Sequence, residues 1–245
     1  MNLRLIRVLL LKEIKDLIWN GQVAILFVTS ILMILVFFTF NQLEFNLPGH
    51  SITMFKGIPT TLSFIVLLVT MYVQGNLMVE EKEQNTERLL GLIKVKYINV
   101  FISKAIVTYI LSYLLFVLAM VIHGYSFENF ITASFFTIPF FLMFLFLGTI
   151  IAEASSNTIE VSLYGWPIFI VYFVIEGLIY SSIESRFFYL FPNYHIERGF
   201  SLIEHGEFLA VFNYIYVPII WMFIILFFLK KRRKNSKTIL NSGFS

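Results

Sequence analysis

The chain has no cysteine among its 245 residues, so it can form no disulfide bond and offers no thiolate to a metal ion or a substrate. Charged side chains are also scarce, because Asp, Glu, Lys and Arg make up 13% of the chain, against about 25% in soluble domains. Hydrophobic residues make up 58%, and 29 residues are phenylalanine. A soluble core could not bury that much apolar surface, so the composition predicts a membrane protein.

Sequence patterns of several enzyme classes are missing as well. No Gly-x-x-x-x-Gly-Lys-Ser/Thr segment cradles phosphates, so any ATP hydrolysis linked to this chain must occur on another one. There is no Gly-x-Ser-x-Gly elbow, and Glu80-Glu81 is followed by Asn85 where a Glu-Glu-x-x-x-Arg metalloprotease needs arginine. We expect no catalytic residue, no cofactor or metal bound by this chain, and no nucleic-acid partner.

The apolar residues gather in runs of about 20, the length that crosses roughly 30 Å of hydrocarbon as a helix. Without a linker or a second composition regime, they predict a single all-α transmembrane domain, residues 1–245, with six spans. The expected spans are Val23–Phe40, Ile58–Met78, Val100–His123, Ile131–Ile151, Ile159–Tyr180 and Ala210–Leu229.

Lys and Arg are distributed unequally between the two sides of these spans. The N-terminal segment, the loop after the second span together with Lys104 at the entrance of the third, and the C-terminal tail hold 15 of the 18 basic residues. Cytoplasmic loops carry such an excess, so both termini are expected in the cytoplasm. An even number of spans agrees with this orientation.

Residues 1–20 read as an amphipathic helix rather than a cleaved signal, because charges flank short apolar stretches and no cleavage site follows. Such a helix is expected to lie in the cytoplasmic interface, with Trp19 at headgroup depth. The alternative is a basic topology signal. The apolar face would consist of Leu3, Ile6, Leu10, Ile14 and Leu17.

The loop after the second span, residues 79–99, is the longest charged stretch between spans. It opens with acids and closes with bases, and Thr86 can cap a short helix. Such a helix would be apolar on one face and charged on the other, and would suit docking into a groove of a soluble partner. The alternative is a solvated loop resting on headgroups.

Glu81-Lys82-Glu83-Gln84-Asn85-Thr86 through Leu90, with Lys104 18 residues after Thr86, resembles the signature of type-2 permease subunits of ATP-binding-cassette transporters. The six spans, the N-terminal interfacial helix and the longer outer loop are similar to that family too. The sequence departs from its pattern at Arg88, where Glu is common, and at Lys94, where Pro is common.

The resemblance implies an exporter in which two permease copies, identical or homologous, form the path through the bacterial cytoplasmic membrane. Two separate ATPase subunits would bind ATP and Mg. The segment around Glu81–Leu92 would form the coupling helix that meets the ATPase, and Ala152–Glu160 a smaller contact. The expected coupling residues are Glu81, Glu83, Thr86, Glu87, Leu89, Leu90 and Ile93.

The outer loop, residues 181–209, contains an aromatic run too short to span the membrane. The resemblance implies a re-entrant gate there, formed by Phe187, Phe188, Phe191 and Pro192, and an aromatic belt anchor is the alternative. Four further residues of the loop could be zinc ligands by type but lack a ligand spacing, and we read them as solvated: His195, Glu197, His205 and Glu207.

Glu176 lies about one turn inside the outer end of the fifth span. An ionisable group in a span is a functional candidate, because burying it is costly. A carboxylate so close to the interface can also snorkel to the headgroups.

Rival functions are a secondary transporter, which would call for inverted repeats that the sequence does not display, and a membrane scaffold; an intramembrane enzyme fits less well. The apolar spans favour hydrophobic or amphipathic cargo. Residue usage suggests an AT-rich bacterium, and among relatives of that kind exporters of membrane-active toxin or antimicrobial peptides are common.

Overall fold

A computed structural model describes residues 3–42, 46–47, 50–51, 57–84, 86, 95–180 and 185–242. Within these residues the chain is helical apart from one small hairpin, in which β1 (Asn46–Leu47) pairs antiparallel with β2 (His50–Ser51). The protein is therefore all-helical in architecture, as its composition predicts.

Six helices of the described chain are long and apolar enough to cross a membrane, which confirms the predicted number. The second is built from three consecutive pieces that run on without a break. The first five are α2 (Gly21–Gln42), α3–η1–α4 (Gly57–Phe64, Ile65–Met71 and Tyr72–Glu83), α6 (Tyr97–Ile122), α7 (Phe127–Ala154) and α8 (Thr158–Tyr180). The sixth, Phe208–Arg232, includes two short pieces and most of α11 (Tyr216–Ser242).

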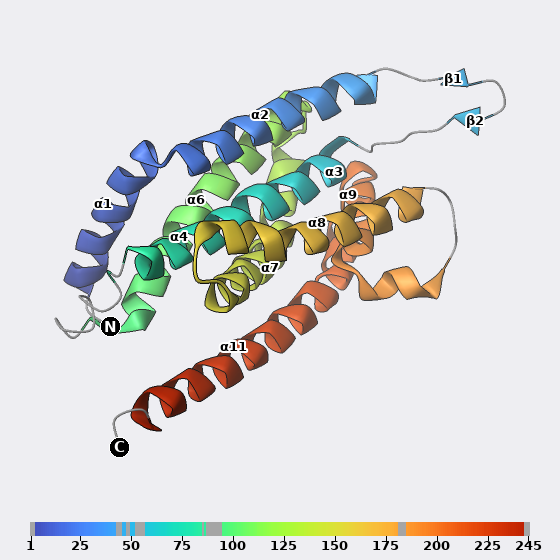
Figure 1. The fold of residues 1–245 in the computed structure, drawn as a ribbon. Helices are drawn as coiled ribbons and strands as arrows, with labels where there is room; N and C mark the ends of the chain where they lie inside the picture. The colour runs from blue at the N-terminus through green and yellow to red at the C-terminus, as the bar shows by residue number, and fades with distance from the viewer. Residues whose placement is uncertain are drawn as a thin grey trace.

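The shorter elements lie at the ends of the bundle. They are α1 (Leu3–Trp19), η2 (Arg186–Leu190), α9 (Pro192–Glu204), α10 (Phe208–Val211) and η3 (Phe212–Tyr214). Figure 1 shows α1 and the C-terminal end of α11 toward one end of the bundle, and the β1–β2 hairpin and α9 toward the other. We refer to these as the α1 end and the α9 end.

The second span is the centre of the bundle. Its most apolar window is 89% buried, whereas the corresponding windows of α2, α8 and α11 are each 22% buried. Its middle piece, η1, is a π-helix, a form that is rare and often found at functional sites. A Cβ added at Gly148 of α7 would lie 2.2 Å from the carbonyl oxygen of Met71, so only glycine lets these two helices approach so closely.

Polar side chains also join the helices around this central span. Gln74 of α4 accepts a hydrogen bond from Thr108 of α6 at 2.9 Å and donates one to Thr149 of α7 at 3.3 Å. Thr70 donates to Ser112 of α6 at 2.9 Å. Hydrogen bonds between side chains fix helices in an apolar medium, because there the hydrophobic effect does not hold them together.

Helix α1 packs along α6 at the α1 end. Its buried side chains are Ile6, Leu9 and Glu13, whereas Ile14 is 48% exposed. The side that faces the protein therefore overlaps only partly with the apolar face predicted from the sequence. Trp19, 84% exposed, is free to contact headgroups.

Candidate coupling site

Four charged side chains meet at the α1 end, where α1 crosses the ends of α4 and α6. The Lys104 Nζ atom lies 2.8 Å from Glu13 Oε2 and 3.2 Å from Glu81 Oε1. Lys12 Nζ donates to the same Glu81 Oε1 at 2.9 Å. We call Lys12, Glu13, Glu81 and Lys104 the charge cluster; it joins α1, α4 and α6.

The charge cluster is neutral and largely buried. Lys104 and Glu13 are each 1% exposed, and Glu81 is 7% exposed. Removing ions from water costs several kcal/mol each, and close opposite charges must offset that cost. Two acids and two bases do so here, and the cluster therefore holds its three helices in one arrangement.

Lys12 is the most exposed member of the charge cluster, with its side chain 45% exposed. Burial acts to lower the pKa of Lys12, but the hydrogen bond and charge of Glu81, together with the charges of Glu13 and Asp16, outweigh it. The pKa of Lys12 is therefore raised, and the ammonium stays protonated at neutral pH.

Thr86 extends the charge cluster into the segment after α4. Its hydroxyl contacts Glu81 Oε2 and donates to the backbone oxygen of Glu81 at 3.2 Å. Glu83 is exposed. The remaining predicted coupling residues lie outside the described part of the chain: Glu87, Leu89, Leu90 and Ile93.

A second set of contacts ties the same end of α4 to α7. Lys82 Nζ donates to the carbonyl oxygens of Ala152 at 2.6 Å and Ser155 at 3.3 Å, at the C-terminal end of α7. A cation is favourable there, because the C-terminal end of a helix carries partial negative charge. Tyr97 of α6 donates to Glu153 at 2.8 Å. The loop after the second span and the segment Ala152–Glu160, both expected to face the cytoplasm, are thus linked through α4, α6 and α7.

At the α9 end, Glu176 is buried, with 5% of its surface exposed, so the snorkelling interpretation is wrong. Tyr180 donates to its Oε1 at 3.5 Å, and Thr60, Ser63 and Asn193 lie around the carboxyl group. Glu176 Oε2 and Asn193 Oδ1 have no hydrogen-bond partner. Here a carboxyl group is surrounded by neutral groups of α3, α8 and α9.

The predicted gate residues lie in and beside two short helices at the α9 end. The aromatic run forms the short 3-10 helix η2, in which Phe188 is buried and Phe187 is 57% exposed. The rings of Phe187 and Phe191 lie 4.9 Å apart. Pro192 begins α9, a position that suits proline because the first helical turn leaves its N–H groups unbonded.

His195 and Glu197 are 1% and 7% exposed, so reading them as solvated loop residues is wrong, whereas His205 and Glu207 are exposed. His195 Nε2 lies 2.9 Å from the carbonyl oxygen of Tyr189. Burial lowers the pKa of His195, and that hydrogen bond opposes the shift only in part. Within the described residues, no three His, Asp or Glu side chains gather as metal ligands.

The arrangement at the α1 end suits mechanical connection rather than chemistry. Its ammonium and carboxylate groups neutralise one another, and none is held as a nucleophile beside a free base. The sequence motif identified Glu81, Thr86 and Lys104, but Glu13 and Lys12 were not recognised as their partners.

The chain was also compared with known proteins. No protein-family model, curated protein or solved structure matches it.

Proposed function

We propose that this chain is the membrane-spanning permease subunit of an ATP-driven exporter of the ATP-binding-cassette class. The observation that carries the proposal is the contact of Glu81 with both Lys104 and Thr86. These three residues belong to the motif that resembles type-2 permeases. Their convergence gives the motif a physical role, because it fastens the segment after α4 to the membrane helices.

The contacts supply a route for force. A movement of the segment after Thr86 reaches Glu81 first, then Lys104 on α6, and through it Glu13 on α1. Lys82 carries the same movement to the end of α7. ATP binding that closes a pair of ATPase subunits would in this way displace several helices together.

The partners follow from the same proposal. Two ATPase subunits bind ATP and Mg, and a second permease copy, identical or homologous, completes the path. Helix α1 and the C-terminal end of α11 lie at the α1 end of the bundle (Figure 1), and the excess of Lys and Arg supports a cytoplasmic position for this end in the proposed bacterial membrane. The apolar spans favour export of hydrophobic or amphipathic molecules, among them membrane-active peptides.

The direct test is whether an ATPase subunit is encoded beside the gene and is captured with the protein. Replacing both Leu89 and Leu90 by alanine removes two anchors, each worth over about 1 kcal/mol in a small docking surface. Since about 1.4 kcal/mol is a factor of ten, ATPase binding should weaken at least tenfold and export should fall. Insertion in the membrane should persist.

Lys234→Ala, a change in the basic tail, is the control and should retain ATPase binding and export. Wild-type binding and export by the Leu89→Ala, Leu90→Ala variant would contradict the coupling role. A purified complex with a single permease copy would contradict the proposed dimer.

A further inference from the structure

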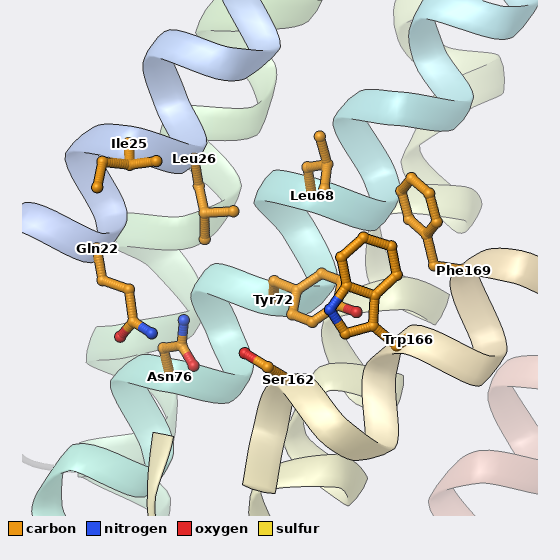
Figure 2. A pocket seen from close by; sticks show the side chains of 9 residues that line it. All are labelled: Gln22, Ile25, Leu26, Leu68, Tyr72, Asn76, Ser162, Trp166 and Phe169. Atoms are coloured by element: carbon orange, nitrogen blue, oxygen red, sulfur yellow. The ribbon is translucent and has the colours of Figure 1, made fainter. Parts of the chain in front are cut away.

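A cleft of about 210 Å³ lies beside the central span, between α2, α4 and α8 (Figure 2). Figure 2 shows the polar groups of Gln22, Asn76 and Ser162 toward one end of the cleft and the rings of Trp166 and Phe169 toward the other. Trp166 is 55% exposed, so the cleft opens on the outside of the bundle rather than into its centre.

Two polar atoms in the wall of the cleft have no partner. They are the Tyr72 hydroxyl and Asn76 Oδ1, from residues that are 6% and 2% exposed. Residues four apart lie on the same face of a helix, so Tyr72 and Asn76 both line the cleft from α4. Leaving a buried polar group unbonded is costly, and a ligand that bonds to both would recover that cost.

Tyr72 is held in place by its neighbours. A Cβ added at Gly165 of α8 would come within 2.6 Å of the Tyr72 ring, so this glycine makes room for the phenol. The rings of Trp166 and Phe169 pack edge to face, with centroids 5.3 Å apart. The polar and the aromatic parts of the cleft are therefore both preformed.

The lining restricts the ligand. Among the described residues, no Asp, Glu, Lys or Arg lines the cleft, so they offer no counter-ion to a charged head group. Its volume is below the roughly 300–1,000 Å³ of pockets that enclose a drug-sized ligand. The cleft therefore accepts one end of a molecule whose remainder lies along the lipid-facing surface of α2 and α8.

We infer that this cleft binds the head of a neutral amphiphile, an amide or alcohol that donates to Asn76 Oδ1 and bonds to the Tyr72 hydroxyl, with its chain against Trp166. The inference rests on the proposed function in one respect: with the α1 end in the cytoplasm, the cleft lies in the inner half of the bilayer. The cargo of the exporter is then a neutral amphiphile, and it enters from the inner half of the bilayer.

Tryptophan fluorescence tests the binding with the permease alone, in phosphatidylcholine nanodiscs. Replacing Trp19 and Trp221 by phenylalanine leaves Trp166 as the reporter, and replacing Trp19 and Trp166 leaves Trp221 as its matched control. The probe is a bromine-labelled fatty amide, compared with the fatty-acid anion and the trimethylammonium compound of the same chain. The amide should quench Trp166 saturably and at lower concentration than either ion, whereas Trp221 should be quenched only in proportion to probe in the bilayer.

The variant Asn76→Leu with Tyr72→Phe removes both unpartnered groups, so amide binding should weaken about tenfold. Its melting temperature should be no lower than that of the parent. Unsaturable quenching that is equal at both tryptophans, or unchanged amide binding by this variant, would overturn the inference. So would a lower melting temperature, because the two groups would then be bonded within the resting protein.

Because the chain has no cysteine, Ser162→Cys also reports whether a second copy fills the cleft. Rapid disulfide dimers that the amide does not inhibit would overturn the amphiphile as occupant. No ATPase is present in these assays. Failure to capture an ATPase therefore counts against the proposed function alone, while failure of amide binding counts against this inference alone.

Discussion

At the α1 end, Glu13 is 1% exposed and its carboxyl group lies 2.8 Å from the Lys104 ammonium. At the α9 end, Glu176 is 5% exposed, and the described contacts of its carboxyl group are with hydroxyl and amide groups. The first carboxyl group faces an opposite charge and the second faces neutral dipoles. The two ends should therefore respond differently to removal of a charge, since an unpaired buried ion costs more than an unfilled hydrogen bond.

The largest effect is expected for Lys104→Met. This change leaves Glu13 and Glu81 with only Lys12 near them, and breaking a buried pair in this way costs about 3–5 kcal/mol. The free energy of unfolding, measured by detergent titration, should fall by that order. Adding Glu13→Gln restores neutrality and should recover part of the loss; a double variant as unstable as Lys104→Met would show that charge balance is not what stabilises this end.

Matched Glu→Gln substitutions compare the two ends directly. Glu13→Gln should lower the free energy of unfolding by roughly 1.5–3 kcal/mol, the worth of a hydrogen bond to a charged group. Glu176→Gln keeps a carbonyl oxygen among the same donors and should change the free energy of unfolding by less than about 1 kcal/mol. Equal losses at the two positions would mean that Glu176 has an ionic partner in the assembled protein.

The α9 end should lose stability in mild acid through His195. Burial lowers the pKa of His195 below its usual 6.5, so the folded protein binds this proton less readily than the unfolded chain. Its contribution is complete above about pH 6.5 and is lost as the pH falls toward the lowered value. The fall in melting temperature over this range should be smaller in His195→Gln than in the wild type.

His205→Gln is the control for that experiment, because His205 is exposed. It should show the same pH dependence as the wild type. If it reduced the dependence as much as His195→Gln does, burial of His195 would not be the cause.

The smallest effect is expected for Lys12→Met. Its ammonium is bonded to Glu81 but its side chain is 45% exposed, so solvent screens the pair and the loss should stay below about 1 kcal/mol. Lys15→Met, at an exposed position on the same helix, should leave the free energy of unfolding unchanged. A loss for Lys12→Met as large as for Lys104→Met would show that water does not reach this side of the charge cluster.

The sequence predicted what depends on local pattern. Apolar runs of membrane length located all six long helices, because the bilayer fixes how many residues a span needs. The motif brought Glu81, Thr86 and Lys104 to attention. It gave no sign of Glu13, which is 91 residues from Lys104 along the chain and pairs with it only after α1 packs on α6.

The cleft and the buried histidine escaped prediction for the same physical reason. Tyr72 and Asn76 are ordinary members of a span until the packing of α2 and α8 leaves them beside an opening. His195 follows a proline in a stretch that reads as a loop. Its burial depends on the contacts of α9 with α3, α7 and α8, which no local periodicity encodes.

The π-helical piece η1 also decides where the central span tolerates a change of length. A π-helix bonds each residue to the fifth along rather than the fourth, so Ile65–Met71 holds more chain than α-helical turns of the same rise would need. A deletion in a regular helix turns everything beyond it by about 100° and moves each side chain to another face. A deletion within η1 would instead be absorbed as the piece closes into α-helical turns, and Gln74 and Asn76 would keep their faces. A variant that lacks one residue of η1 should therefore retain the same helix contacts.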